Sequence, residues 1–477
     1  MCIANTARCW PRTHLLISAS PTRPIHFGII FESPEIIQQP TYASTRPAGQ
    51  GLLQAAGKLL GHPWIGVLIS AGAMVVLLYW MLCGWVPPNW ALLGACLAAM
   101  RWCLYTYWMN GYWGGALAAC GGALVVGSMG RLMRSARPPN RLGYFLAAGA
   151  GLLLVTMPVE GLFLVIPLMA ALLLGLRQRA LRLVLPMVVI LVPVVAWMGY
   201  YNWRVTGDVM RTAMDVHRAV YGTETFVSEH HDAEPRFRHP ALREFHEWED
   251  KIHRDREAKP FFTMLINLAV GWRFLLGPAL TLAALGLGWT LRRRRTFPLL
   301  VIGAVCLAAA STETWMHPHA LAPVCGLFLV ILVQSMRHLH AIRFWGIPYG
   351  IVFVRAVVLT CAAMLLVPPI NRMLGIRYEV SYGAWWSIEE EPDRPRIYKQ
   401  LEDTEGKDLV MVRYMPGEPI AQPWVYNEAD IDGAGIVWAR EMSPEKDQAL
   451  PGYFAGRRVW LLEPNLKPVQ LKAYSPQ

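Results

Sequence analysis

The sequence predicts a polytopic α-helical membrane protein with about ten membrane segments and a small C-terminal α/β soluble domain. Hydrophobic residues make up 54% of the 477 residues and charged residues only 16%, against about 25% charged in an ordinary soluble domain. The mean hydropathy is +0.31. Apolar stretches long enough to cross a bilayer recur between residues 64 and 367, as expected of a chain that crosses a membrane several times.

Polar or proline-containing turns divide the apolar part into ten segments. One pair, within 142–176, must return to the side from which it started, because a basic loop lies at each of its ends. At about 1.5 Å per residue this stretch spans only ~52 Å, well short of two ~30 Å crossings. A shallow or tilted helical hairpin that turns at "TMPVEG" is therefore expected. The ten segments are 64–84, 88–108, 111–130, 142–157, 159–176, 183–201, 270–291, 297–313, 318–336 and 346–367.

Arginines predict which ends of these segments face the cytoplasm. Four connecting loops hold 13 arginines and no acid, whereas the short turns around Asn110, Pro158 and Pro318 hold no Lys or Arg. Cytoplasmic loops are enriched in Lys and Arg, so the basic loops are predicted to be cytoplasmic. This placement also accounts for the net charge of +11 without a nucleic-acid partner. The arginines are Arg131, Arg134, Arg137, Arg141, Arg177, Arg179, Arg182, Arg292, Arg293, Arg294, Arg295, Arg337 and Arg343.

With this orientation every long polar segment faces outward. The predicted parts are an atypical tail over 1–30, an outer loop over 31–63, a transmembrane domain over 64–367 with an outer loop at 202–260, and a periplasmic α/β domain over 371–477. In the second loop "HPALREFHEWEDKIHRDREAKP" is expected to form an amphipathic helix. In the C-terminal domain "PRIYKQLEDT" and "SPEKDQALPGYFAG" predict helices, and "DLVMVRY", "GIVWARE" and "RRVWLLE" predict strands.

The cysteines and the histidine pair of the outer loop do not predict a metal site. Seven of the nine cysteines lie in or beside apolar segments, and no CxxC spacing occurs, so neither a disulfide framework nor a zinc site is indicated. Adjacent His230 and His231, followed by Asp232, have a poor chelating spacing, and solvated or structural roles are expected for them.

Two turns carry side chains suited to chemistry. Glu160 in "TMPVEG" lies between two apolar helices, where a charge costs ~2.5–3.5 kcal/mol on insertion scales. It is either functional or part of a boundary turn. Glu313, His317 and His319 in "TETWMHPHA" lie at an outer turn that leads into a helix. Imidazoles near a helix N-terminus can bind phosphate; interfacial histidines are the alternative.

A third feature is the stretch "FESPEIIQQPTYASTRPAGQG" at residues 31–51. Tyr42, Arg46 and Gln50 could bind a phosphate or a sugar, and Glu32 or Glu35 could act as a general base. The alternative is a connector stiffened by proline. The aromatic residues of "YWMNGYWGG", which include Tyr112, could instead form an interfacial belt.

Several long phrases resemble bacterial membrane glycosyltransferases of the GT-C superfamily, similar to protein O-mannosyltransferases and lipid A aminoarabinose transferases. They include "QQPTYASTRPAGQGLLQAAGKLLGHPWIGV", "YWMNGYWGGALAACGGALVVGSMGR", "MPVEGL", "YYNWRVTGD", "HPHALAPV" and "WVYNEADIDGAGIVWARE", and the resemblance covers roughly residues 27–477. It implies an inverting transfer of a sugar from a polyprenyl-phosphate donor to a periplasmic or lipid acceptor at the bacterial inner membrane. A carboxylate would take the acceptor's proton, and cationic or hydrogen-bonding groups, or a divalent metal, would stabilise the leaving phosphate.

The resemblance also assigns roles to residues. It makes 31–63 the end of the first outer loop, which carries the general base, and it matches His319 to a late outer turn and Glu160 to the acid of an "RPxEG"-like turn. The arginine of that turn is replaced by Met157, which weakens a phosphate contact there. The catalytic candidates within the chain are Glu32 and Glu35, and the donor-binding candidates are Tyr42, Arg46, Gln50, Tyr112, Glu160, His317 and His319.

The family's first span and the acidic motif that follows it are missing before residue 31. Residues 1–26 hold no apolar run long enough to carry the outer loop across the membrane, so a misplaced or frameshifted start is expected. The general base would then lie upstream of Met1, with Glu32 and Glu35 as its neighbours, and this form of the chain could be inactive.

Two other functions are alternatives to sugar transfer. A transporter or flippase of an envelope lipid or glycan calls for internal repeats and a polar path at the membrane midplane, whereas the polar groups of this sequence gather at one face. A non-catalytic envelope protein would bind its partner through the C-terminal domain. For the transferase, the expected partners are a lipid-linked sugar donor, an envelope acceptor and membrane lipids.

Overall fold

The computed structural model describes two compact units, each assembled from segments far apart in the chain. The sheet unit takes its residues from Met1–Arg46, Gly199–Ala258 and Glu389–Gln477, and the helical unit from Pro47–Met198 and Lys259–Ile388. The predicted tail over 1–30 lies outside the described residues apart from its last one. The described residues are 30–33, 35–135, 139–176, 181–221, 239–292, 296–311, 313, 316–375, 393–415, 424–428, 430–442, 444–466 and 468–474.

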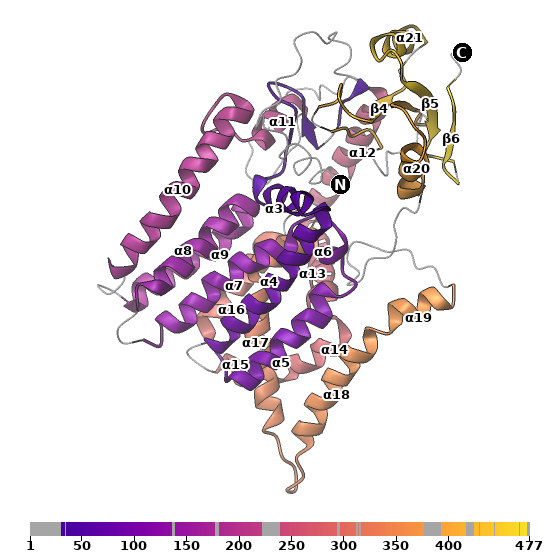
Figure 1. The fold of residues 1–477 in the computed structure, drawn as a ribbon. Coiled ribbons are helices and arrows are strands. Elements are labelled where there is room, and N and C mark those ends of the chain that lie inside the picture. Colours follow the sequence, from indigo (N-terminus) through magenta and orange to yellow (C-terminus); the bar gives the residue numbers. More distant parts are fainter. Residues whose placement is uncertain are drawn as a thin grey trace. The chain divides into compact units, whose positions relative to one another are not determined.

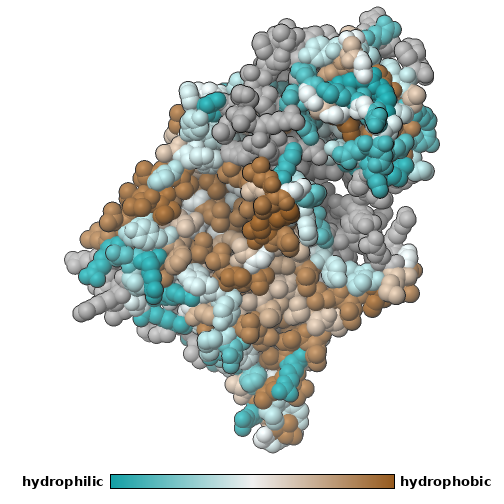
Figure 2. Space-filling model, in the orientation of Figure 1, coloured by the Kyte–Doolittle hydropathy of each residue, from teal (hydrophilic) through white to brown (hydrophobic). Residues whose placement is uncertain are grey.

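The helical unit is built from helices that run side by side, with shorter ones at their ends (Figure 1). Apolar side chains dominate the visible surface of this unit, whereas the sheet unit shows a mostly hydrophilic one (Figure 2). The helices are α3 (Ala48–Leu59), α4 (Pro63–Cys83), α5 (Pro88–Ala98), η1 (Ala99–Cys103), α6 (Tyr107–Asn110), α7 (Gly115–Leu132), α8 (Arg141–Thr156), α9 (Pro158–Leu176), α10 (Leu181–Thr206, shared with the sheet unit), α13 (Pro260–Leu275), α14 (Gly277–Thr281), η3 (Leu282–Gly286), α15 (Leu287–Leu291), α16 (Phe297–Ser311), η4 (Pro318–Leu321), α17 (Ala322–His340), α18 (Tyr349–Met364) and α19 (Val367–Met373).

Helix length and composition confirm a multi-pass membrane protein. Six described helices are long and apolar enough to cross a membrane, and a seventh span results if one bent pair counts as one. α8 and α16 are shorter apolar helices. Each of the ten predicted segments contains a helix, while the number of ten crossings stays a prediction. The six are Pro63–Cys83, Gly115–Leu132, Pro158–Gly175, Leu181–Thr206, Pro318–His340 and Tyr349–Asn371.

Two predicted segments are not straight spans. The segment 88–108 passes from α5 into the π-helical η1 and then through a turn, in which Leu104 is extended and Tyr105 has a φ of 60°, before α6 begins at Tyr107. The segment 270–291 begins ten residues early, in α13, and bends by 93° before α14. Gly277 permits this bend with a φ of 58°. Arg101 donates from Nε to the Phe274 carbonyl at 3.1 Å, which satisfies an oxygen that the end of α13 leaves unpaired.

The predicted hairpin over 142–176 is formed by α8 and α9, with Met157 between them. The 16 residues of α8 and the 19 of α9 correspond to ~24 Å and ~28 Å at the usual rise. α9 is long enough to be a candidate span, whereas α8 is not, and together they are shorter than two full ~30 Å crossings. A shallow or tilted placement therefore remains the prediction for this hairpin.

α7 packs against α4, α8 and α17 at the centre of the helical unit. Its sequence is rich in glycine and alanine, and small residues let helix backbones approach closely in membranes. Gly122 shows how close this approach is. A Cβ atom at this position would overlap the carbonyl oxygen of Pro323, the second residue of α17.

The sheet unit holds a four-stranded sheet of order β4-β3-β5-β6. β3 (Asp408–Val412) pairs in parallel with β4 (Ile436–Arg440) and β5 (Arg458–Glu463), and β6 (Gln470–Ala473) runs antiparallel to β5. The three predicted strands are confirmed, as are the helices α20 (Asp393–Glu402) and α21 (Pro444–Tyr453). The short edge strand β6 was not predicted. The remaining elements are α11 (Ala213–Tyr221), α12 (Pro240–Glu257), β1 (Ile36–Ile37) and β2 (Ala43–Ser44).

Both faces of this sheet are covered. Leu409 and Met411 of β3 face a cluster that includes α21 and the N-terminal segment, and Val410 and Val412 face α20. This alternation is the period of two that a strand imposes, and burial on both faces explains why β3 is apolar from Leu409 to Val412. In the first cluster the ring of Phe31 packs edge-on against Phe454 of α21, with centroids 6.4 Å apart. The opening stretch of the chain is thus part of a core.

The buried side-chain amide of Asn427 binds the backbone of the edge strand β4. Asn427 is 1% exposed, its Nδ2 donates to the Trp438 carbonyl at 2.7 Å, and its Oδ1 accepts from the Trp438 amide at 2.7 Å. We expect Asn427→Ala to lower the free energy of unfolding by about 2–4 kcal/mol, because it leaves two buried backbone groups unpaired. Thermal unfolding of the purified protein measures this. Gln448→Ala on the exposed side of α21 is the control, and equal midpoints for the two variants would contradict the prediction.

Candidate functional site

The turn between α16 and α17 is fixed by a buried amide of α13. Asn267 is 1% exposed, and its Nδ2 donates to the carbonyls of Ser311 at 2.9 Å and Glu313 at 2.7 Å. Ser311 ends α16, so the amide takes up an oxygen without a helical partner. The sequence reasoning missed Asn267. A lone amide inside an apolar stretch was the signal that could have found it.

Four rings gather at η4. The rings of His317 and His319 are nearly parallel, with centroids 5.3 Å apart and an angle of 8° between the planes. Trp113 stacks on His319 at 5.3 Å, and the hydroxyl of Tyr107 lies 3.3 Å from His319 Nδ1. The turns "YWMNGYWGG" and "HPH", which are about 200 residues apart in sequence, therefore form one surface. His319 is 9% exposed within it.

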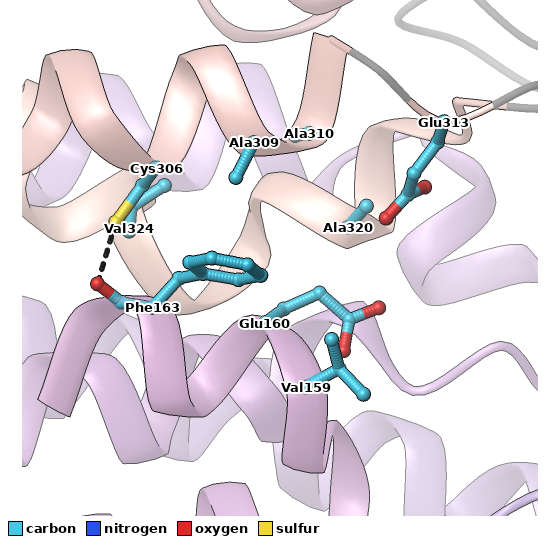
Figure 3. Close-up of a pocket in the computed structure, with 9 residues that line it drawn as sticks. All are labelled: Val159, Glu160, Phe163, Cys306, Ala309, Ala310, Glu313, Ala320 and Val324. Atoms are coloured by element: carbon cyan, nitrogen blue, oxygen red, sulfur yellow. Dashed lines mark hydrogen bonds between the residues drawn. The ribbon is translucent and has the colours of Figure 1, made fainter. Parts of the chain in front are cut away.

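Two carboxyl groups meet at a small pocket in the same region (Figure 3). Glu160, in the first turn of α9, and Glu313, after the end of α16, reach toward one another across it. The pocket has a volume of about 20 Å³, room for a single water molecule. None of its nine described lining residues is basic. They are Val159, Glu160, Phe163, Cys306, Ala309, Ala310, Glu313, Ala320 and Val324.

The surroundings make Glu313 a weak acid. Burial, and then the charge of Glu160, raise the pKa of Glu313 from 4.5 to about 7. At neutral pH this carboxyl group therefore exists in both protonation states. A general base works best when its pKa lies near the working pH, so Glu313 has the acidity that proton transfer requires.

Two glutamines of α3 face the beginning of α7. Gln54 donates from Nε2 to the carbonyl of Tyr112 at 3.0 Å. Gln50 lies against Gly114, the residue before α7, whose φ is 81° and which provides no side-chain cap. The Oε1 atoms of both glutamines are buried, and no hydrogen-bond partner for them lies among the residues that the structure describes. The positive end of α7 and these amides together form a polar patch beside Trp113 that favours an anionic or hydroxylated group.

The catalytic candidate Glu35 is held in an ion pair. Arg46 donates from Nε and Nη2 to the two carboxylate oxygens of Glu35, each at 3.0 Å. Burial acts to raise the pKa of Glu35, but the charge and hydrogen bonds of Arg46 outweigh it and leave this pKa below its usual value. A carboxylate stabilised in this way is a weak base.

Glu32 and Tyr42 also bind within the sheet unit. Glu32 is 3% exposed and accepts from the Tyr221 hydroxyl at 3.0 Å and from the His239 amide at 3.2 Å. Its backbone carbonyl accepts from Arg440, and the Tyr42 hydroxyl accepts from the Asn427 amide at 3.4 Å. These contacts hold the N-terminal segment against the sheet. The roles in catalysis and donor binding predicted for Glu32, Glu35, Tyr42 and Arg46 stay hypotheses.

The other predicted features are Met157 of the "TMPVEG" turn and the histidine pair of the outer loop. Met157 is 8% exposed and packs into the core of the helical unit, so it brings no charge to the "TMPVEG" turn. His230, His231 and Asp232 lie outside the described residues. Within the described ranges, no three His, Cys, Asp or Glu side chains come together as a metal site.

Comparison with known proteins gives a likeness in structure. No family model matches the chain, and no curated protein does. Crystal structures of ArnT from Cupriavidus metallidurans, bound to undecaprenyl phosphate and in the apo state, are similar to it. Each shows 13% identity and a TM-score of 0.48 over 97% of this chain and 88% or 87% of the ArnT chain. ArnT is a lipid A aminoarabinose transferase.

Proposed function

We propose that the chain is a membrane glycosyltransferase that moves a sugar from a polyprenyl-phosphate donor to an acceptor hydroxyl. One observation carries this proposal: a carboxyl pair and an imidazole pair meet at η4. Ala320 lines the pocket together with Glu160 and Glu313, and the preceding residue, His319, stacks on Trp113. A group that accepts a proton and groups that bind an anion are what such a transfer requires.

The imidazoles and the start of α7 are the proposed donor site. Protonated or neutral imidazoles donate hydrogen bonds to phosphate oxygens, and the backbone N–H groups at a helix start do the same. Trp113 offers a flat apolar face for a sugar ring, and Gln50 and Gln54 of α3 lie behind the start of α7. Developing charge on the leaving phosphate would be stabilised by these donors.

Glu313 is the proposed general base. The acceptor oxygen attacks the anomeric carbon, the bond from that carbon to the phosphate oxygen breaks, and its electron pair leaves with the phosphate. The acceptor's proton passes to the ionised form of Glu313. We prefer Glu313 to Glu32 and Glu35 because Glu32 is held in buried hydrogen bonds, and Glu35 in a partly buried ion pair, of the sheet unit.

We also propose that η4 faces the periplasm of a bacterial inner membrane. The arginine distribution supports this orientation. In the helical unit, Arg134 at the end of α7 and Gln334 near the end of α17 both donate to the Trp85 carbonyl, at 2.8 Å and 3.1 Å. The basic ends of α7 and α17 therefore lie together, and η4 begins the opposite end of α17.

The test is transfer of a radiolabelled sugar from polyprenyl-phosphate donors by the chain in proteoliposomes. We expect His319→Ala to lower kcat/KM at least tenfold, mainly through a higher KM for the donor, because it removes a phosphate contact and the ring on which Trp113 stacks. His253→Gln on α12 is the control. Full activity of both His319→Ala and Glu160→Gln would refute the site, and no transfer with any donor would favour a transporter.

A further inference from the structure

A two-residue hairpin joins α17 to α18. Phe344 and Ile347 exchange both backbone hydrogen bonds, at 3.1 Å and 2.9 Å, and enclose Trp345 and Gly346, whose φ values are 48° and 79°. Two successive positive φ values define a turn that normally takes Asn-Gly. A bulky residue with positive φ is strained, so the closed hairpin holds Trp345 in an outward direction at a conformational cost.

The hairpin presents a cluster of large apolar side chains. Trp345 is 97% exposed and Phe344 is 63% exposed, and Ile347 and Tyr349 are about half exposed. In the helical unit this turn protrudes beyond the ends of α5 and α15 (Figure 1), and hydrophobic and hydrophilic residues lie next to each other at its tip (Figure 2). Such an apolar cluster normally has an occupant.

The charged side chains within the hairpin and in the helical turn before it are arginines. Arg343 is exposed within the hairpin, and Arg337 lies in the last turn of α17 together with His338 and His340. The sequence holds no Asp or Glu between Glu313 and Glu379. The surface therefore complements an anionic partner with an apolar layer behind its charges.

We propose that this hairpin inserts its aromatic tip into the headgroup region of the adjacent leaflet and that Arg343 pairs with an anionic phospholipid there. The chain itself places the tip, because α17 and α18 belong to two candidate spans that end at His340 and begin at Tyr349. The eight connecting residues must then lie at a membrane surface. Tryptophan and tyrosine favour this boundary, and clustered cations favour the anionic cytoplasmic leaflet, which is the side the arginines predict.

This anchor would set the depth of the proposed donor site. The span Pro318–His340 contains 23 residues, which correspond to ~34 Å of helix. His319 lies at one end of it and the hairpin follows the other. A tip fixed in one leaflet would therefore hold η4 at a constant height at the opposite membrane surface. The lipid contact itself does not depend on the proposed transfer reaction.

Fluorescence of the full chain in vesicles tests the proposal. Emission of the wild type minus that of Trp345→Phe isolates Trp345. In phosphatidylcholine vesicles with 30% phosphatidylglycerol we expect lipids brominated near the headgroup to quench this emission at least twofold and aqueous acrylamide to have little effect. The control is Trp460 in β5 of the sheet unit. Its emission, isolated in the same way with Trp460→Phe, should not be quenched by the brominated lipid. If acrylamide quenches the emission of Trp345 and brominated lipid does not, the proposal is overturned and a protein partner is favoured.

Arg343→Gln tests the choice of lipid. In the wild type, quenching of Trp345 by brominated lipid should increase when phosphatidylglycerol is present. Arg343→Gln should remove this increase while quenching in phosphatidylcholine alone remains. An increase that survives in Arg343→Gln would contradict the pairing with an anionic headgroup.

Discussion

Glu313→Gln is expected to lower kcat for sugar transfer by about 100-fold or more, with KM for the donor nearly unchanged. A positioned general base contributes about 10²–10⁴-fold, and the amide keeps the shape of the side chain but cannot take a proton. Kinetics in proteoliposomes with a labelled donor measure both constants. Glu249→Gln, on α12, is the matched control and should behave as the wild type does. Retained kcat in Glu313→Gln would remove this residue from the mechanism.

The pH dependence of the transfer rate tests the coupling between Glu160 and Glu313. Burial and the charge of Glu160 raise the pKa of Glu313 to about 7, so the basic form is lost below neutral pH and the rate should fall tenfold per pH unit there. Glu160→Gln removes the neighbouring charge. The pKa of Glu313 should then move toward 4.5 and the acid limb of the rate profile should shift to lower pH. An acid limb that stays in place in Glu160→Gln would contradict this coupling.

As the pH rises toward neutral, the stability of the wild type should fall while its activity rises. Because the folded state raises the pKa of Glu313, it binds the proton more tightly than the unfolded chain, and stability falls as the pH rises from 4.5 to about 7. The loss amounts to about 3 kcal/mol at most. Glu313→Gln cannot ionise, so its thermal midpoint at pH 8 should exceed that of the wild type. An inactive but more stable variant cannot be explained by misfolding.

Gly122→Ala is expected to destabilise the helical unit by about 3 kcal/mol or more. The added Cβ would overlap the carbonyl oxygen of Pro323, so α7 and α17 would have to separate over their whole contact. Thermal unfolding in detergent, followed by tryptophan fluorescence, measures the change. Gly72→Ala on α4 is the control, because a Cβ there meets no atom within 4 Å. Alanine is also the better helix former by about 1 kcal/mol. Equal midpoints for both variants would show that the helices can relax.

The regular elements were largely predictable because their signals are local. Apolar runs located a helix within each of the ten segments, and β-branched runs located β3, β4 and β5. The two breaks were not predictable. At Gly277 the bend depends on Arg101, 176 residues earlier, which binds the carbonyls at the end of α13. A hydropathy pattern contains no information about a contact between such distant positions, so it predicted one continuous segment across the bend.

The candidate site was predictable in its parts but not in its assembly. Glu160, Glu313, His317 and His319 stood out as polar groups at apolar boundaries. Which of them meet depends on how the helices pack. Glu160 faces Glu313 across the pocket, and Trp113 stacks on His319. Glu32 and Arg46 were also predicted as site residues. Both make contacts within the sheet unit, which the sequence did not predict, and their roles in the reaction stay hypotheses.

The segments of the sheet unit also determine when it can be completed during synthesis. Arg440 binds the Glu32 carbonyl across 408 positions of the chain, and a ribosome needs roughly 20–80 s to translate that distance. Until β4 and α21 emerge, Ile30, Phe31 and Ile36 lack the apolar partners that bury them. Exposed apolar segments of this kind attract chaperones and proteases. A chain that stops early would therefore remain open to degradation, and the closed sheet unit would mark a molecule that was translated to its last strands.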